Sequence, residues 1–343
     1  MFITRRPLIT SLLAIIVSTV SLPTLAAEVN IYSARKENLI KPLLDKFSAE
    51  TGIKTNLITA KADKLLTRMI NEGRNTPADI FITVDAGRLH RAKQADILQV
   101  FESPIIDKTV PQHLRDTDRL WVGLSQRARV ILYARDRVKP EQLSTYEDLA
   151  DPKWKKRICI RGSGNIYNQS LVASMIAVNG KDATQKWAKS LVNNFARDPK
   201  GGDRDQIKAA AAGQCDIAIA NTYYYGTMLA DKKDVAQLEA AKKMAIFWPN
   251  QNDRGTHVNV SGAGISKYSK NKKEAIKLLE FLVSTEAQNW YASVNHEYPV
   301  SADAALSDLV AGWGEFKSDI LNLSRLGELN AEAVKIMDRA GWK

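Results

Sequence analysis

The residues of this sequence that could bind a metal are tyrosines at two positions along the chain. Tyr223, Tyr224 and Tyr225 are adjacent and directly follow an apolar run, and Tyr167 follows the glycine-bracketed turn 162–164. A phenol has a pKa of about 10, so only a strongly polarising cation removes its proton at neutral pH. Hard ferric iron suits hard anionic oxygen ligands, and three phenolates would cancel its charge. The alternative is that these tyrosines are packing aromatics, each with a polar tip.

The elements that must position these tyrosines are two predicted strands, Lys156–Ile160 and Asp216–Ala220. Ligands usually bind where the strands of a parallel sheet end. If the two strands are neighbours, the loops that carry Tyr167 and Tyr223 emerge at the same edge of the sheet. The tyrosines would then converge on one site.

The rest of the chain alternates strands with helices. The strand pattern Glu28–Tyr32 precedes the amphipathic helix Asn38–Glu50, and from about residue 270 helices dominate. This alternation predicts an α/β protein built on mostly parallel sheets. Because no Gly/Ser-rich or Pro-rich linker is present, we expect two lobes joined by extended strands near 121–129 and 247–258 rather than two independent domains.

The first 26 residues have the pattern of a signal peptide. Two arginines precede an apolar run from Leu8 to Leu22, and cleavage after Ala26 leaves small residues at the −3 and −1 positions. Arg5 and Arg6 also resemble a twin-arginine export signal. The alternative is a membrane anchor, but the run is shorter than the roughly 20 residues that span a bilayer. We therefore expect an exported protein without stable membrane insertion.

The chain has two cysteines, Cys159 and Cys215. In an exported protein an even pair indicates a disulfide. Each cysteine lies in or beside one of the two strands that precede the tyrosines, so we expect a strand-to-strand bridge. Two free buried thiols are the alternative.

The positive charge of the chain is spread along its length. The sequence has 49 Lys and Arg against 38 Asp and Glu, and removal of residues 1–26 leaves 47 against 38, a net charge of +9. Basic residues are not interleaved with aromatics, which argues against a nucleic-acid-binding protein. No phosphate-binding loop, metal-spaced histidines or nucleophile–base pair is present, so the sequence does not indicate an enzyme.

Four segments of the mature chain carry a resemblance to a known family. The chain resembles the periplasmic ferric-ion-binding proteins, which are transferrin-like solute-binding components of bacterial iron(III) ABC transporters. The segments are 29–35, 77–85, 164–171 and 221–224. The resemblance implies a type II periplasmic solute-binding protein with two lobes, which holds Fe(III) in the interlobe cleft. It also implies a monomer that delivers iron to an inner-membrane ABC permease and binds no nucleic acid.

The expected lobe boundaries follow from this resemblance. The N-terminal lobe would comprise residues 27–124 and 254–300, and the C-terminal lobe residues 125–253 and 301–343. The alternative is a solute-binding protein of the same fold for another small cargo, namely a polyamine, thiamine or a phosphonate. Loss of Tyr167 would distinguish the two, because iron binding would not survive it.

Carried over by position, the resemblance implies that Tyr167, Tyr223 and Tyr224 are the iron ligands. Many family members have His, or His followed by Tyr, shortly after the first strand, where this sequence has Lys36 and Glu37. Three phenolates fill only half of an octahedron. The remaining positions would be filled by an exogenous anion, water or Glu37.

Two arginines could hold the anion. Some relatives of this kind bind a synergistic carbonate through an arginine, and Arg127 and Arg129 are at the matching strand. A planar guanidinium can hold carbonate in bidentate fashion. We favour Arg127, and the alternative for either arginine is an interlobe ion pair. Arg35 and Tyr32 lie near the end of the first strand and could line the cleft.

Overall fold

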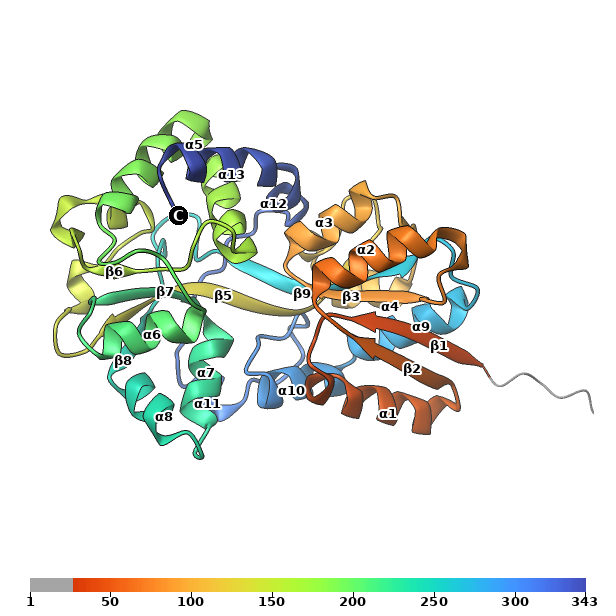
Figure 1. The fold of residues 1–343 in the computed structure, drawn as a ribbon. Coiled ribbons are helices and arrows are strands. Elements are labelled where there is room, and N and C mark those ends of the chain that lie inside the picture. The colour runs from red at the N-terminus through yellow and green to blue at the C-terminus, as the bar shows by residue number, and fades with distance from the viewer. Residues whose placement is uncertain (1–26) are drawn as a thin grey trace, which may run out of the picture.

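Two long strands run through the molecule, which the computed structural model describes for residues 27–343. Strand β5 (Val122–Ala134) first pairs with β9 (Val258–Ser266) in antiparallel register, as far as the pair Ala128↔Val258. From Arg129 onward, β5 instead pairs with strands of the second lobe. The two lobes are therefore joined by extended strands, as predicted (Figure 1). The second of these strands, β9, begins only at Val258, the last residue of the predicted stretch 247–258, most of which is a loop.

The N-terminal lobe is built on the sheet that contains β9. Its strands are β1 (Glu28–Ser33), β2 (Lys54–Thr59), β3 (Ile80–Val84) and the short β4 (Leu98–Gln99). The helices of this lobe are α1 (Lys41–Thr51), α2 (Ala62–Glu72), α3 (Ala86–Gln94), α4 (Pro104–Thr109), α9 (Lys272–Leu282) and α10 (Thr285–Val294). The apolar stripe of α1 is buried, and the helix ends at Gly52, whose φ of 71° suits the residue without a Cβ.

The C-terminal lobe is built on the second half of β5. Its other strands are β6 (Ile158–Cys159), β7 (Ile217–Asn221) and β8 (Met244–Phe247). Its helices are α5 (Ile166–Asn193), α6 (Asp203–Ala211), α7 (Thr222–Ala230), α8 (Val235–Lys242), α11 (Asp308–Ala311), α12 (Ser324–Glu328) and α13 (Asn330–Arg339). Helix α5 is interrupted at Gly180, where the sequence pattern predicts a break between two helices.

The sheets are mixed rather than mostly parallel. β1 is parallel to β2 and β3, and β6 is parallel to β7, but β5 and β9 are antiparallel to all the strands they pair with. The prediction of mostly parallel sheets was wrong here, because the two strands that cross between the lobes run in opposite directions. The α/β class itself is confirmed.

Cys159 and Cys215 form the predicted disulfide, with 5.9 Å between their Cα atoms. Cys159 lies in β6, and Cys215 lies two residues before β7, the strand that β6 pairs with in parallel. The bridge therefore ties together the two strands that lead toward the tyrosines.

The signal peptide and the lobe boundaries stay predictions. The predicted signal peptide, residues 1–26, lies outside the described residues, within which no helix is long and apolar enough to cross a membrane. The lobe boundaries at 124/125 and 253/254 remain a prediction. They fall near the point between Ala128 and Arg129 where β5 exchanges its pairing partners.

Candidate metal centre

Tyr167, Tyr223 and Tyr224 form one cluster. The hydroxyl of Tyr223 donates to that of Tyr167 at 3.2 Å, and the ring centroids of Tyr223 and Tyr224 are 4.3 Å apart. All three side chains are partly exposed, so a small cargo can reach them. Tyr225 lies apart from the cluster, because its buried hydroxyl donates to the carbonyl of Met244 at 2.9 Å.

Helix N-termini carry all three tyrosines. Tyr167 lies in the first turn of α5, and Tyr223 and Tyr224 lie in the first turn of α7. The unsatisfied N–H groups and the dipole at a helix N-terminus favour negative charge. The same backbone geometry that gathers the phenols therefore also stabilises their deprotonated form once a cation binds.

Burial makes two of these phenols harder to deprotonate. Burial raises the pKa of Tyr223 well above its usual value, and the neighbouring Tyr167 and Tyr224 raise it further. Burial and the proximity of Tyr167 also raise the pKa of Tyr224. A cation that binds to these oxygens must therefore displace their protons.

Arg127 is a buried cation without a partner at this site. Its side chain is 1% exposed, and none of its three guanidinium nitrogens has a hydrogen-bond partner within residues 27–343. The guanidinium carbon lies 5.8 Å from the ring centroid of Tyr167. Because an unpaired buried charge is costly, this arrangement favours the binding of an anion beside the tyrosines.

Arg129, by contrast, uses both terminal guanidinium nitrogens for contacts within its own lobe. It donates to Asn168 Oδ1 at 2.6 Å and to Asn221 Oδ1 at 3.0 Å, and it lies 3.4 Å from the carboxylate of Asp203. Asn168 and Asn221 directly adjoin the two tyrosine-bearing segments. Arg129 therefore holds the tyrosine helices in place, and its contact with Asp203 is an ion pair within one lobe rather than between lobes.

Three further residues near the tyrosines were missed from the sequence. Asp203, which is fully buried, accepts the backbone N–H of Asn221 at 3.1 Å and lies 3.7 Å from Arg161. The guanidinium carbon of Arg161 is 5.7 Å from the Tyr167 ring centroid, and that of Arg204 is 5.9 Å from the Tyr224 ring centroid. Arg161 was detectable as a charged residue directly after a strand. Asp203 and Arg204 lie in α6, and the sequence gives no signal that tertiary packing brings this helix to the site.

The predicted N-terminal-lobe residues do not contact the tyrosine cluster. The Tyr32 hydroxyl donates to Glu72 at 2.9 Å, and the ring is buried against α2. Arg35 forms a buried ion pair with Glu297 and stacks on the ring of Tyr291. Glu37 is exposed at the start of a short 3-10 helix, Glu37–Leu39.

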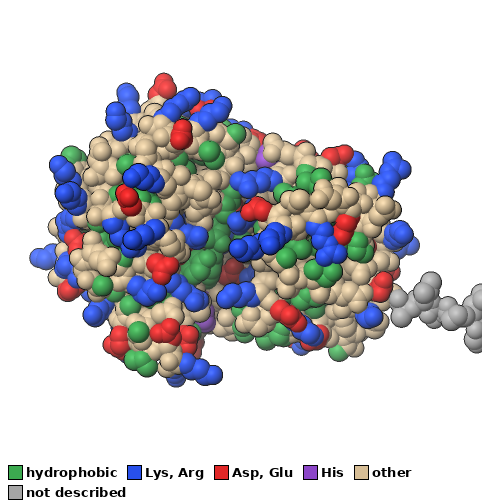
Figure 2. All heavy atoms as spheres, viewed as in Figure 1, with side chains coloured by type: hydrophobic (Ala, Val, Ile, Leu, Met, Phe, Trp, Pro, Cys, Tyr) green, Lys and Arg blue, Asp and Glu red, His purple; other side chains and the backbone are tan. Residues whose placement is uncertain are grey.

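The surroundings of the cluster are cationic. Figure 2 shows a groove between the two lobes, with hydrophobic side chains at its base and Lys and Arg side chains along its walls. Within residues 27–343, no group of three or more His, Cys, Asp and Glu side chains could hold a metal ion. In this part of the chain, the candidate metal ligands that lie together are thus phenol oxygens.

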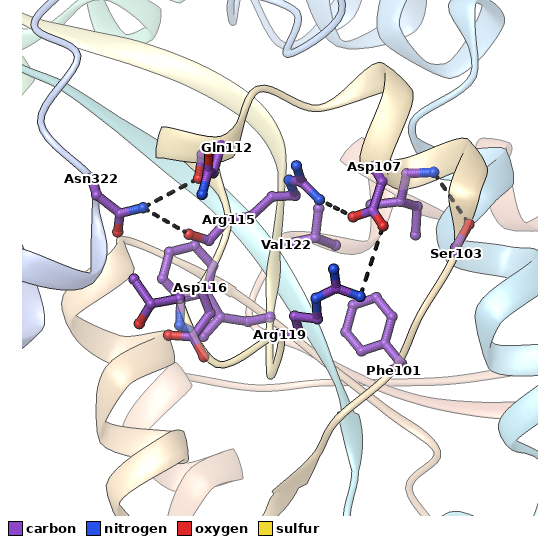
Figure 3. Close-up of a pocket in the computed structure, with 12 residues that line it drawn as sticks. Phe101, Ser103, Asp107, Gln112, Arg115, Asp116, Arg119, Val122 and Asn322 are labelled. Carbon is purple, nitrogen blue, oxygen red and sulfur yellow. Dashed lines mark hydrogen bonds and ion pairs between the residues drawn. The ribbon is translucent and has the colours of Figure 1, made fainter.

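A separate cavity of about 120 Å³ lies beside the start of β5 (Figure 3). Its two arginines already have acidic partners, since Arg115 pairs with Asp107 and Arg119 lies 3.3 Å from Glu102 and 3.9 Å from Asp107. Its positive charge is therefore neutralised, unlike that of Arg127 in the groove.

Two lobes joined by crossing strands, with polar groups gathered between them, define a two-lobed solute-binding protein. The chain belongs to the family of bacterial extracellular solute-binding proteins, whose model matches residues 75–313. The fold class and the family resemblance expected from the sequence are confirmed.

Individual relatives match over most of their length. The chain is 52% identical to iron uptake protein A1 of Synechocystis sp. over 92% of this chain and 88% of that protein. It is 28% identical to the major ferric iron-binding protein of Neisseria meningitidis serogroup B, over 95% and 96% of the two chains. The structure of Trichodesmium FutA (IdiA) in complex with iron and citrate is similar, with a TM-score of 0.90 and 50% identity over 92% of this chain and all of that one.

Proposed function

We propose that this protein binds Fe(III) in the periplasm through Tyr167, Tyr223 and Tyr224 and delivers it to an inner-membrane ABC permease. The observation that carries the proposal is the convergence of three phenols at two helix N-termini beside a buried, unpaired guanidinium. Relatives named for ferric iron binding and iron uptake support it.

The chemistry is reversible capture rather than catalysis. Three phenolates balance the charge of a ferric ion. Hard anionic oxygen ligands also bind Fe³⁺ more strongly than they bind softer or less charged metal ions. The tyrosines release their protons as iron binds, and the lobes meet around the cargo through movement at β5 and β9. No covalent step on the cargo is needed, and the protein is not an enzyme in this proposal.

The remaining coordination positions belong to a synergistic anion and water in this proposal. Arg127 would hold a planar anion such as carbonate in bidentate fashion, because its guanidinium is buried, unpaired and next to Tyr167. The Trichodesmium relative is described in complex with iron and citrate, which supports an anion as a partner of the iron. Glu37, which is exposed and follows β1 by four residues, is the remaining side-chain candidate in this proposal.

The proposal includes export and a partner. Residues 1–26 would direct the chain to the periplasm and be removed there, through either the general or the twin-arginine route. The mature protein would be a monomer that meets its permease in the iron-loaded state. It would bind no nucleic acid and would not insert stably into a membrane.

Metal analysis and absorption spectroscopy of the protein, with and without added ferric iron, test this function. We expect one iron per chain and a visible phenolate-to-Fe³⁺ charge-transfer band. Tyr223→Phe should bleach most of this band, whereas Tyr225→Phe is the matched control because its hydroxyl bonds only Met244. An iron-loaded protein without a visible band would refute the proposal. A phosphonate or polyamine that binds equally well to the Tyr167→Phe variant would favour the alternative cargo.

A further inference from the structure

One buried carboxylate connects the two lobes beside the groove. Asp85 directly follows β3 of the N-terminal lobe and is fully buried. Its Oδ1 accepts the N–H of Gly87, at the start of α3, at 2.9 Å. The same oxygen accepts the hydroxyl of Ser170, on α5 of the C-terminal lobe, at 2.7 Å. Its Oδ2 accepts the side-chain amide of Asn259 at 3.0 Å.

The contact with Ser170 reaches the helix that carries Tyr167. Residues three apart in a helix lie on the same side, so Ser170 is one turn below Tyr167. The lobes approach closely here, since a Cβ added to Gly87 would lie 3.1 Å from the side chain of Ile166, the first residue of α5. A shift of α5 relative to Asp85 would therefore move Tyr167.

The contact with Asn259 reaches β9, the strand that pairs with the Arg127 strand, β5. Asn259 lies in β9, opposite Arg127 of β5 in the antiparallel register. The carbonyl oxygen of the Asn259 side chain accepts the backbone N–H groups of Ala86 and Val260, at 2.9 and 2.8 Å. Asn259 is thereby fixed to both β9 and the start of α3.

Asp85 holds this position against two unfavourable features. Its φ of 83° lies in the left-handed region, which is strained for a residue other than glycine. Its carboxylate forms no ion pair within residues 27–343, and the nearby Arg88 and Arg91 of α3 face Asp63 instead. Only hydrogen bonds and the N-terminus of α3 compensate its charge. Strain of this kind concentrates where geometry serves function.

We propose that Asp85 is a positioning residue that sets the orientation of the Tyr167 helix and the Arg127 strand relative to the N-terminal lobe. This inference rests on the proposed function, in which Tyr167 and Arg127 contact the cargo. Asp85 itself touches no cargo and acts through Ser170 and Asn259. Its loss would loosen the contact between the lobes while it leaves the phenol oxygens unchanged.

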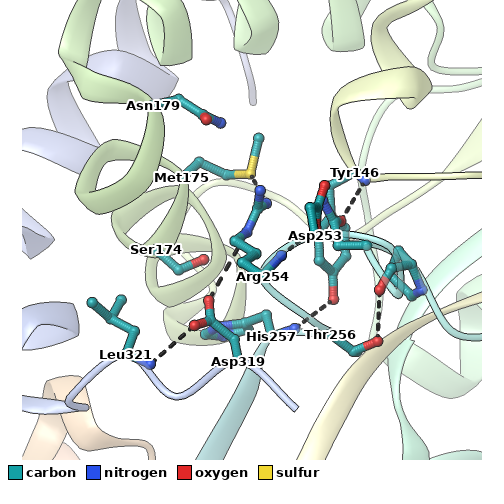
Figure 4. Close-up of polar contacts among 12 residues, drawn as sticks. Tyr146, Ser174, Met175, Asn179, Asp253, Arg254, Thr256, His257, Asp319 and Leu321 are labelled. Atoms are coloured by element: carbon teal, nitrogen blue, oxygen red, sulfur yellow. Dashed lines mark hydrogen bonds and ion pairs between the residues drawn. The ribbon is translucent and has the colours of Figure 1, made fainter. Parts of the chain in front are cut away.

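The test compares Ser170→Ala with Ser174→Ala. Ser170→Ala removes only the bond between the lobes. Ser174 (Figure 4) is one turn further along α5 and also buried. Its hydroxyl, however, donates to the carbonyl of Leu171 within the helix at 2.7 Å. We measure the rate at which excess ferric chelator removes iron from each loaded protein. Ser170→Ala should release iron roughly three- to tenfold faster than Ser174→Ala, with the visible band at an unchanged wavelength.

The outcomes separate this inference from the proposed function. Equal release rates in the two variants, with a normal visible band, overturn the positioning role and leave iron binding intact. If the wild-type protein shows no band at all, the proposed function fails. In that case, small-angle scattering of the iron-free variants tests the positioning role without iron. A larger radius of gyration for Ser170→Ala than for Ser174→Ala supports the role of Asp85 in lobe orientation, and equal radii overturn it.

Discussion

At the scale of single residues, the site is prepared for a cation and an anion in different ways. The phenols of Tyr223 and Tyr224 resist deprotonation, because burial raises the pKa of each. Arg127 is charged and unpaired before any cargo arrives. The empty site is therefore net positive, and its phenols turn negative only when a metal displaces their protons.

Proton release on metal binding follows from these pKa shifts. Because Tyr223 and Tyr224 are both protonated in the free protein, each ferric ion should release about two or more protons, and iron affinity should rise steeply with pH. The measurement is the alkali needed to hold the pH constant when a ferric chelate is added to weakly buffered protein. The Tyr224→Phe variant should release about one proton fewer than wild type. Binding without any proton release would contradict this assignment.

Arg127 should control the dependence on a synergistic anion. We expect Arg127→Gln to weaken iron binding about tenfold or more in bicarbonate buffer and to abolish the effect of added bicarbonate. Arg127→Lys keeps the charge but not the bidentate fork, so it should restore only part of the effect. Affinity is measured by competition with a ferric chelator at constant pH. An unaltered bicarbonate effect in Arg127→Gln would remove Arg127 from the anion site.

At the scale of elements, the loop that leads into β9 is held by buried and partly buried polar groups. Arg254 donates to Glu147 at 2.6 Å and to the sulfur of Met175 at 3.0 Å, and it lies 3.9 Å from Asp319 (Figure 4). The backbone N–H of His257 donates to the Tyr146 hydroxyl at 3.2 Å. These contacts join β9 to α5 and to the C-terminal segment, so they stabilise one side of the interlobe connection.

His257 should make this connection sensitive to acid. Burial, followed by the charges of Arg129, Arg254 and Arg127, lowers the pKa of His257 to about 3. In the unfolded chain its pKa is about 6.5, so between these values the unfolded state binds a proton that the folded state does not. His257 thus contributes a loss of stability as the pH falls through this window, on the order of 1 kcal/mol per pH unit.

Urea unfolding between pH 7 and pH 5 measures this effect. Other groups also titrate, so the informative quantity is the difference between wild type and His257→Gln. The free energy of unfolding of wild type should fall more steeply with acidification than that of the variant. Parallel slopes would show that His257 does not carry the pH dependence.

At the scale of the whole molecule, the two lobes differ in their tasks. The three tyrosines of the cluster and the arginines around them belong to the C-terminal lobe, and Arg127 belongs to the crossing strand β5. The N-terminal lobe contributes the facing wall of the groove and, through Asp85, a fixed point for α5. In the proposed site, the binding groups thus lie in one lobe, and the other lobe would affect release through Asp85.

Local patterns in the sequence predicted much of this architecture. The alternation of strands and helices, the break in α5 and the pairing of Cys159 with Cys215 all depend on neighbouring residues or on the small number of cysteines. The convergence of Tyr167 with Tyr223 followed from two strands of one parallel pair, β6 and β7. Mixed strand directions were missed, because the direction of the crossing strands has no local signature.

What the sequence determined by itself is the set of chemical groups, namely the phenols, the cysteines and the two arginines of one strand, together with the family to which they belong. Only the tertiary structure decided which groups are free. Arg127 and Arg129 are two residues apart in one strand, and their types and spacing do not distinguish them. Asp203, 74 residues away from Arg129 in the chain, packs against it and leaves Arg127 unpaired. Tyr32 likewise faces α2 rather than the groove. Such differences arise from long-range packing, which brings together charges that no local pattern relates.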